Sequence, residues 1–471
     1  MKALRLCRIV WRIATAGMLM LGLSVFGPVP AALAERLVLG ASPQQADTTV
    51  GCIYPMTGRA AIYGEDGIAG IRLALKDIAE GRVKGLPRRE EAGEAAYVFP
   101  RLRVIVDDAL SKSSYGRRLA EDFIDKDHVN FLCGMVSSGV AQEVSKLAGQ
   151  RGIILIGTDH ASSRLTMEAG HPHYFRVTND SWTSNAAGAR YLRDTRAQHP
   201  WKRIAILNPD YDYGHVSRDD FLAAMDELGL DYEVVAELWP KLYEPDYSSY
   251  IQALKDAKPD LVVTALWGGD YIAFLKQALA ADLFSQMRVA NFDTGANYDV
   301  LVALGDNPQP GLIGSARHLN NWPDTLANRR FVQAFHDMTG RYPTYAAEGA
   351  YSGIIAIAKA VAEVGNATED AALIRALEGM RLTLPEDPEG YETVIDPLTH
   401  QALQAQAVGE PVPGTGFPPA KVMLGNIRAY DAEDLRPPAA LVQARRSRQG
   451  VSAPPPAETT SLPPSVPVAP Q

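Results

Sequence analysis

Apolar positions recur with two different periods along most of the chain. Short runs of aliphatic residues, such as Val50 to Ile53, are followed by longer segments in which apolar residues return every three or four positions. The short runs are typical of buried strands, and the longer segments of amphipathic helices. One such helix is marked by Ile68, Ile71, Leu75 and Ile78. Strands that alternate with helices predict parallel sheets covered by helices.

This alternation occurs in two successive blocks, the first over about 50–156 and the second over about 204–291. Two blocks of this kind favour two doubly wound lobes over one continuous sheet. Further along, the order changes: long helical patterns cover 326–339 and 345–364, and a strand-like alternation follows over 390–407.

The stretch 131–166 indicates where a binding site would form. An apolar strand ends in a small, hydroxyl-rich loop at 134–139, a helical pattern follows, and a second strand ends in the polar loop 157–163. In a strand–helix–strand unit both loops lie at the carboxyl ends of neighbouring strands, where open α/β sheets bind ligands. Ser137 and Ser138 stand at the helix start, where free N–H groups and the helix dipole favour a small polar or anionic group.

Both ends of the chain differ from the middle. Residues 1–34 combine four basic residues, an apolar run over 13–26 and a closing Ala-Leu-Ala, which predicts a cleavable signal peptide. An uncleaved anchor is the alternative, but the run is short for a membrane span. Cys7 precedes the run and therefore cannot carry a lipid at the cleavage site, so we expect a soluble exported protein. From Arg436 the chain is rich in Pro, Ala and Ser, which predicts a disordered tail over 436–471.

The net charge argues against nucleic acid and anionic membranes as partners, and the cysteine content argues against a metal site. Without residues 1–34, which carry four cations and no anion, the formal charge changes from −9 to −13. Such an acidic chain is a poor partner for nucleic acid or anionic membranes. Cys52 and Cys133 both fall on predicted central strands, which favours buried thiols; a disulfide is the alternative. Neither CxxC nor HxxxH occurs, so no metal site and no cofactor is predicted.

Five short motifs follow one another in a characteristic order. They are PMTG at 55–58 with Tyr63-Gly64 after it, SSG at 137–139, DYDYG at 210–214, YAAEGAY at 345–351 and DPLTHQ at 396–401. With these motifs, the chain resembles the periplasmic solute-binding proteins of ABC importers, in the branched-chain amino acid-binding (Leu/Ile/Val-binding) type I family. The resemblance covers about 50–438, nearly all of the mature domain.

The resemblance implies an α/β fold of two Rossmann-like lobes, joined by a three-segment hinge, that close on a ligand like a clamshell. Lobe one would be 47–170 plus 318–380, and lobe two 171–317 plus 381–435. The implied function is that of a non-enzymatic, monomeric periplasmic protein, which captures an amino acid or a related amide. It would deliver this ligand to an ABC permease in the inner membrane.

Several site residues carry over from the family. Ser138 would donate its hydroxyl to the ligand's carboxylate, with Ser137 as a weaker neighbour. Ser162 would supply a second hydroxyl, because Ala161 occupies the position where the family usually has one. Asp293 would bind the ligand's amino group, since each charge of a zwitterion then meets its opposite. The alternatives are a helix cap at Ser138 and a turn at Asp293.

Three aromatic residues match wall positions of the family's site, with ordinary core packing as the alternative: Tyr63, Tyr213 and Trp267. Asp159 departs from the family pattern, which normally has a small uncharged residue there. A carboxylate would repel the ligand's carboxylate unless it were paired, for instance with His160 or Arg164. Either Asp159 turns away, or the ligand lacks a carboxylate or carries an extra cation or amide.

Two enzyme classes and one binding alternative compete with this interpretation. An exported hydrolase would need a nucleophile elbow, but GMVSSG at 134–139 does not fit G-x-S-x-G. A dinucleotide enzyme is disfavoured because the helix start at 64–70 reads GxxGxxG and holds two acids that would repel a pyrophosphate. A periplasmic sensor that passes its closed state to a receptor stays open, since no motif marks a docking surface.

Overall fold

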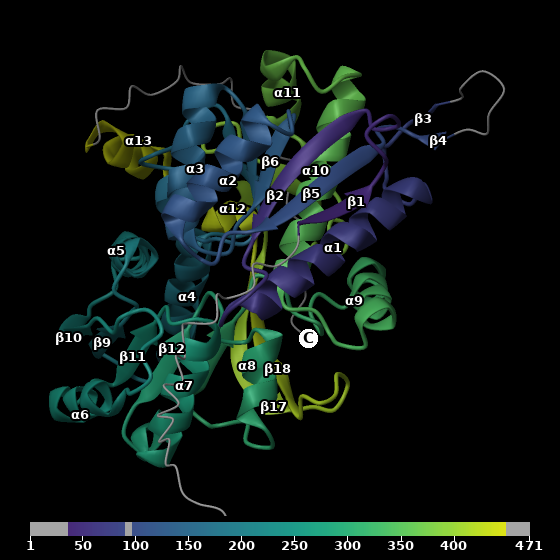
Figure 1. Ribbon diagram of the computed structural model, residues 1–471. Helices are drawn as coiled ribbons and strands as arrows, with labels where there is room; N and C mark the ends of the chain where they lie inside the picture. Colours follow the sequence, from purple (N-terminus) through teal and green to yellow (C-terminus); the bar gives the residue numbers. More distant parts are fainter. Residues whose placement is uncertain (1–35, 90–96, 449–471) are drawn as a thin grey trace, which may run out of the picture. The chain divides into compact units, whose positions relative to one another are not determined.

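Two parallel-rich sheets organise the computed structural model, which describes residues 36–89 and 97–448 (Figure 1). The strands of the first sheet are β1 (Leu37–Gly40), β2 (Thr48–Tyr54), β5 (Leu102–Asp108), β6 (Phe131–Gly134), β7 (Ile154–Gly157) and β8 (Tyr174–Arg176). They lie in the order β1-β5-β2-β6-β7-β8, and β1 alone runs antiparallel to its neighbour. We call this sheet with its helices lobe one.

The second sheet belongs to lobe two. Its strands are β9 (Arg203–Leu207), β10 (Glu233–Leu238), β11 (Leu261–Thr264), β12 (Arg288–Asn291), β13 (Leu312–Ser315), β17 (Gln406–Pro413) and β18 (Val422–Tyr430). The order is β10-β9-β11-β12-β13-β17-β18, with β17 and β18 antiparallel. In both sheets the first strand of the parallel set lies between the second and the third. Each sheet therefore has a switch point, where open α/β sheets bind ligands at the carboxyl ends of their strands.

Six helices belong to lobe one: α1 (Ala61–Ala79), α2 (Ser113–Asp125), α3 (Ser138–Arg151), α9 (Leu326–Thr339), α10 (Tyr345–Val364) and α11 (Asp370–Leu377). Alternate residues of a strand face opposite layers. Val106 packs in one core cluster with α1 and α10, whereas its neighbour Ile105 packs in another with α2 and α3. Burial on both faces explains why these strands are almost continuously apolar.

Lobe two follows the same plan with α4 (Ser181–Thr195), α5 (Asp212–Glu227), α6 (Ser248–Ala257), α7 (Gly268–Ala280) and α8 (Tyr298–Leu304). Ile206 packs with Phe221 of α5, and Val262 packs with Phe274 of α7 on the other face. The smaller elements of the chain are β3 (Arg88–Arg89), β4 (Tyr97–Val98), η1 (Ser163–Leu165), η2 (Leu283–Ser285), β14 (Arg381–Leu382), β15 (Thr393–Ile395), β16 (Ala402–Leu403), α12 (Ala432–Leu435) and α13 (Ala439–Arg448).

The chain passes between the two sheets three times, through 177–180, 316–325 and 404–405. The first and third crossings are joined by hydrogen bonds. The Gln404 side-chain amide donates to the Val177 carbonyl at 3.2 Å, and that of Asn179 donates to the Ala405 carbonyl at 3.3 Å. The two-lobed α/β fold with three crossings agrees with the prediction.

Two of the predicted lobe boundaries differ from the structure. Residues 381–403 were expected in lobe two, but Leu382 and Ile395 are buried in the core cluster that holds Ile354 of α10. β14, β15 and β16 form a separate small sheet, so the strand-like alternation in this region did not mark the second lobe. The third crossing thus lies near 404 instead of 380, and the first lies near 177 instead of 170 because β8 completes the first sheet.

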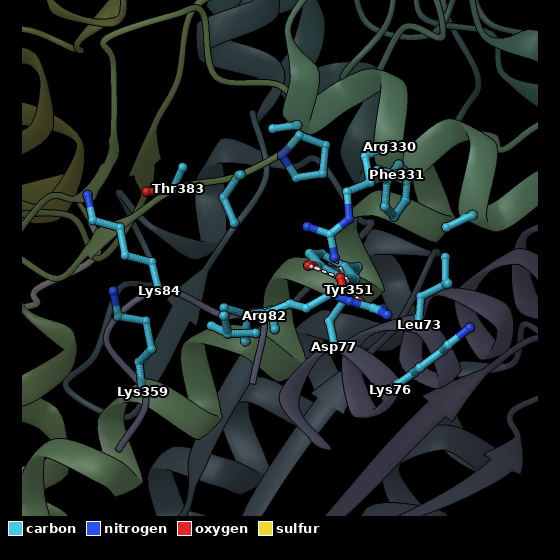
Figure 2. A pocket seen from close by; sticks show the side chains of 16 residues that line it. Leu73, Lys76, Asp77, Arg82, Lys84, Arg330, Phe331, Tyr351, Lys359 and Thr383 are labelled. Atoms are coloured by element: carbon cyan, nitrogen blue, oxygen red, sulfur yellow. Dashed lines mark hydrogen bonds and ion pairs between the residues drawn. The ribbon is translucent and has the colours of Figure 1, made fainter. Parts of the chain in front are cut away.

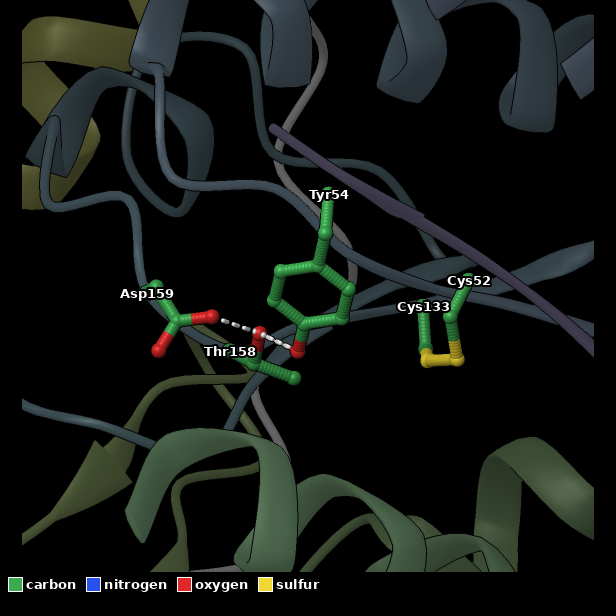
Figure 3. The surroundings of a disulfide bond; sticks show 5 residues. All are labelled: Cys52, Tyr54, Cys133, Thr158 and Asp159. Atoms are coloured by element: carbon green, nitrogen blue, oxygen red, sulfur yellow. Dashed lines mark hydrogen bonds between the residues drawn. A yellow bond between two sulfur atoms is a disulfide. The ribbon is translucent and has the colours of Figure 1, made fainter. Parts of the chain in front are cut away.

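Cys52 and Cys133 form a disulfide, which corrects the preference for buried thiols (Figure 3). β2 and β6 are adjacent parallel strands, and their register places Cys52 directly opposite Cys133 with the two Cα atoms 4.5 Å apart. This separation lies within the range that a disulfide requires. The sequence pattern places both cysteines on one sheet but does not define their register.

The prediction of disorder from 436 onward is wrong for 436–448, where residues 439–448 form α13. Val442 is fully buried there, and two arginines add polar contacts. Arg445 donates to Asp220 of α5 at 2.6 Å, and Arg446 donates to the Leu398 carbonyl at 2.8 Å. These contacts stabilise a helix that has little apolar surface of its own.

The predicted signal peptide, 1–34, and the rest of the predicted tail, 449–471, lie outside the described residues. Within 36–89 and 97–448, no helix is long and apolar enough to cross a bilayer.

Candidate functional site

Loops from both lobes enclose a small cavity at the carboxyl ends of the two sheets. Its lining residues are Val136, Ser138, Asp159, Ala161, Tyr211, Tyr213, Trp267, Asp293, Thr294, Arg317 and Tyr345. Of the predicted site residues, the structure brings together Ser138, Asp159, Ala161, Tyr213, Trp267 and Asp293 here. The cavity volume is about 10 Å³, roughly the space of one water molecule.

Ser138 lies where lobe one presents a helix N-terminus to this cavity. It is the first residue of α3 and is only 2% exposed. Its hydroxyl oxygen accepts a hydrogen bond from the Ser162 backbone N–H at 3.2 Å, and the hydroxyl proton is available to a ligand. Ser137 is the N-cap residue and makes no side-chain capping bond; it lines a neighbouring small cavity instead.

Ser162 and Arg164 connect the two lobes and do not line the cavity. The Ser162 hydroxyl donates to Asp212 at 2.8 Å, and Arg164 forms an ion pair with the other oxygen of Asp212 at 2.6 Å. Asp212 is the first residue of α5 in lobe two. The two contacts are therefore available only while these loops of lobes one and two lie together.

Asp293 follows β12 and is held by partners of its own chain. It accepts hydrogen bonds from Tyr213 at 2.6 Å and from Ser184 at 3.1 Å. Arg317 forms an ion pair with it at 3.1 Å, and both side chains are 4% exposed. The negative charge that was expected to meet a ligand's amino group is thus balanced by an arginine.

Arg317 is the main site residue that the sequence analysis missed. Its guanidinium carbon lies 3.9 Å from the centre of the Tyr345 ring, and its Nη1 donates to the Asp159 carbonyl oxygen. Burial alone would lower the Arg317 pKa, but the charges of Asp293 and other neighbours raise it by more than burial lowers it. The pKa is therefore raised, and the side chain is a cation. Arg317 comes two residues after β13, and this place at a strand end is a signal that could have found it.

Asp159 lines the cavity without the pairing partners that were expected. Thr158 donates to one of its oxygens, and the other oxygen, Oδ1, is buried without a hydrogen-bond partner among residues 36–89 and 97–448 (Figure 3). His160 contacts Met135 and Tyr174, and Arg164 pairs with Asp212. Burial raises the pKa of the Asp159 carboxyl well above its usual range, which favours the neutral form. A neutral acid does not repel a carboxylate and can donate a hydrogen bond to it.

Aromatic side chains form much of the remaining wall. Trp267 donates from its indole N–H to the Tyr211 hydroxyl at 3.0 Å. Tyr63 lies behind this wall: its ring stacks on Tyr345 at 5.2 Å, and its hydroxyl donates to Asp299 at 2.8 Å. Tyr211 and Tyr345 therefore line the cavity although the sequence analysis did not select them, and Tyr63, which it did select, packs one layer further back.

Comparison with known proteins places this chain in a family. Residues 47–414 match the model of the periplasmic binding protein family, and the chain belongs to that family. A Leu/Ile/Val-binding protein homolog 3 from Brucella melitensis is 24% identical over 366 residues, which is 76% of this chain and 89% of that protein. This confirms the resemblance to the branched-chain amino acid-binding group of solute-binding proteins.

Solved structures agree on the fold. A solute-binding protein of an ABC transporter from Rhodopseudomonas palustris BisB5, in complex with 3,4-dihydroxybenzoic acid, superposes with a TM-score of 0.69. It is 25% identical and covers 82% of this chain and 97% of its own. A periplasmic binding protein from Burkholderia mallei gives a TM-score of 0.72 at 18% identity, covering 84% and 98%. The chain is thus an ABC-type solute-binding protein by family and fold.

Proposed function

We propose that the protein captures a small aromatic carboxylate between its lobes and delivers it to an ABC permease. The observation that carries this proposal is the buried Arg317–Asp293 pair. Because Asp293 already has a cation, the ligand need not bring an ammonium group. The ligand's carboxylate would instead meet the Ser138 hydroxyl, the N-terminus of α3 and the free edge of Arg317.

The remaining lining suits an aromatic ring. Tyr211, Tyr213, Trp267 and Tyr345 all border the cavity, and flat aromatic side chains pack well on a planar ligand. The unpartnered Oδ1 of Asp159 could bond a ring hydroxyl. The Rhodopseudomonas palustris BisB5 relative carries 3,4-dihydroxybenzoic acid, a compound of this class.

Binding would require the lobes to separate and close again. A cavity of about 10 Å³ cannot admit a benzoate, so the Ser162–Asp212 and Arg164–Asp212 contacts would break to let the ligand in. The lobes would then close around the ligand with more space between them than in this structure. The ligand then shifts the protein toward its closed state by its greater affinity for that state. The chemistry of the ligand is left unchanged.

We also propose that the protein is exported to the periplasm by its N-terminal segment and acts there as a monomer. The Cys52–Cys133 disulfide supports an oxidising compartment. Thiol titration of the denatured mature protein tests this: purified from the periplasm, it should show no free thiol before reduction and two afterwards.

A thermal-shift screen of the mature protein tests the ligand class. The panel contains benzoate, 4-hydroxybenzoate, 3,4-dihydroxybenzoate, aliphatic amino acids, short amides and urea. A ligand at a hundred times its dissociation constant adds about 2.7 kcal/mol of stability, which is visible in the melting temperature. Shifts confined to the aromatic acids support the proposal, and shifts confined to amino acids or amides contradict it.

An amino acid or related amide is the second candidate, and Asp293 favours it. If Arg317 moved aside, the Asp293 carboxylate could bind an amino group, as the resemblance implied. The name of the Brucella melitensis relative, a Leu/Ile/Val-binding protein homolog, agrees with this alternative. In that case Asp293→Ala should abolish binding of the amine-bearing ligand.

A further inference from the structure

A second, larger cavity lies within lobe one and shares no residue with the small cavity between the lobes, which we call the cleft. Its volume is about 230 Å³, and it is bordered by α1, α9, α10 and the segments 82–84 and 383–385 (Figure 2). This volume approaches the range of small-molecule sites. The cleft forms only where the two lobes meet, whereas this cavity is complete within one lobe.

The floor of the cavity is apolar. It is formed by Leu73 of α1, Phe331 of α9, Tyr351 and Ile355 of α10, and Leu384. The Phe331 and Tyr351 rings meet edge to face with their centres 5.3 Å apart. The Tyr351 hydroxyl is fixed by donating to Asp77 at 3.0 Å. The floor is therefore a fixed surface that can cover the apolar body of a ligand.

Cations surround this floor and outnumber the acids near them. The lining contains Lys76, Arg82, Lys84, Arg330 and Lys359 but only one carboxylate, Asp77. Asp77 is shared by Arg82 at 2.9 Å and Arg330 at 3.6 Å. From outside the lining, Glu80 pairs with Arg82, and Glu392 pairs with Lys84 at 3.2 Å. Glu363 also acts on the charge of Lys359. Even with these three glutamates included, the five cations exceed the four carboxylates by one, in a chain whose formal charge is −9.

The cations lie on two sides of the floor. Figure 2 shows Lys84 and Lys359 on one side and Arg330 and Lys76 on the other, with Tyr351 and Asp77 between them. Lys359 is half-buried, and its ammonium donates to the Arg381 carbonyl at 2.8 Å. Burial lowers the pKa of Lys359, and the nearby charges of Glu392 and Glu363 offset this only in part. Neither glutamate forms a direct ion pair with Lys359 among the described residues, so a ligand anion beside the ammonium would balance its charge.

We propose that this cavity is a second binding site, for a small organic dianion whose two anionic groups are separated by a short apolar body. One anionic group would lie near Lys359 and Lys84, and the other near Arg330. The apolar body would cover Phe331 and Tyr351. An α,ω-dicarboxylate has this chemistry.

Titration calorimetry of the mature protein with adipate at low ionic strength tests the proposal. The expected result is one saturable site that the neutral analogue adipamide does not occupy. The double variant Lys359→Gln and Arg330→Gln should weaken adipate binding at least tenfold. Lys146→Gln, which removes an exposed cation from α3 on the same lobe, is the matched control and should leave binding unchanged.

Two further measurements keep the outcome decisive. Lys84→Gln removes a cation whose side chain is 79% exposed, so folding should be unaffected even if the double variant is unstable, and adipate binding should weaken about threefold. Absence of saturable heat with wild-type protein for adipate, succinate and terephthalate would overturn the proposal. Equal affinity in wild type and Lys84→Gln or the double variant would also overturn it, because the adipate would then lie elsewhere.

Discussion

The cleft and the lobe-one cavity differ in whether their charged side chains are paired. In the cleft, Arg317 is buried and matched by Asp293, whereas the cavity's cations are partly exposed and exceed their carboxylate partners. Breaking a matched buried pair lowers stability, because one charge is left buried without its partner, and the intact pair limits which charges a ligand can bring. Unmatched exposed cations contribute little to stability and are available to an anion. The two sites should therefore respond differently to mutation, pH and salt.

The largest effect is expected from breaking the matched pair. Asp293→Ala leaves the Arg317 guanidinium buried without its counter-ion, and the loss of one partner of a buried pair costs about 3–5 kcal/mol of unfolding free energy. Urea-induced unfolding measures the loss. Glu233→Ala is the control, since it breaks an exposed pair with Arg203 and should cost about 1 kcal/mol or less. Equal losses in the two variants would show that the Arg317–Asp293 pair is not buried.

A buried carboxyl that has no cation beside it should make the stability of the protein depend on pH. Asp387 accepts hydrogen bonds from Leu384 and Thr393 and forms no ion pair among the described residues. Burial raises its pKa to about 7. The folded state then holds a proton that the unfolded state releases, so stability falls as pH rises from about 4 to about 7.

The measurement is urea unfolding at pH 5 and pH 8 for wild type and Asp387→Asn. Asparagine is neutral and has the same shape. From pH 5 to pH 8 the free energy of unfolding should therefore fall by roughly 2–3 kcal/mol less in the variant than in wild type. Identical pH dependence in both proteins would show that Asp387 ionises at its ordinary pKa.

Ser138→Ala should weaken binding in the cleft without changing stability greatly. Loss of a hydrogen bond to a charged group costs about 1–3 kcal/mol of binding free energy. Calorimetry with the best ligand of the thermal-shift screen measures it. Ser137→Ala is the matched control, because Ser137 lines the neighbouring cavity. This variant should bind the cleft ligand with the affinity of the wild type. If both variants weakened ligand binding equally, the Ser138 hydroxyl would not be the group that bonds the ligand.

Salt should produce the smallest effect and should separate the two sites. Screening acts on exposed charges more than on buried ones. Raising sodium chloride from about 50 mM to about 300 mM should weaken adipate binding severalfold and change the affinity of the cleft ligand less than twofold. The same fold-change at both sites would contradict the difference in exposure.

Much of the architecture follows from local patterns. Strand and helix periods place residues at strand ends, and parallel strands bring these ends to one edge of a sheet. The sequence pattern and the family resemblance are therefore sufficient to predict that Ser138, Asp159, Tyr213, Trp267 and Asp293 lie around one cavity. The edge strands β1 and β18 were not predicted.

The contacts between distant segments could not be predicted in the same way. Pairing of Cys52 with Cys133 depends on the register of β2 and β6. The orientation of Ser162 depends on Asp212 in the other lobe. Arg317 pairs with Asp293 only because the loops after β13 and β12, two neighbouring strands, converge. The spacing of apolar residues within one segment does not show which residue of a distant segment will lie beside it.

Calorimetric titration of the mature protein with 4-hydroxybenzoate, 4-hydroxybenzyl alcohol and leucine distinguishes an aromatic carboxylate from an amino acid as the ligand of the cleft. 4-Hydroxybenzoate should bind saturably and one-to-one, whereas the alcohol, which keeps the ring but lacks the carboxylate, should not bind. Leucine should bind far more weakly or not at all, because Arg317 already balances Asp293. Tight binding of leucine with no heat from 4-hydroxybenzoate would show instead that Asp293 binds an amino group.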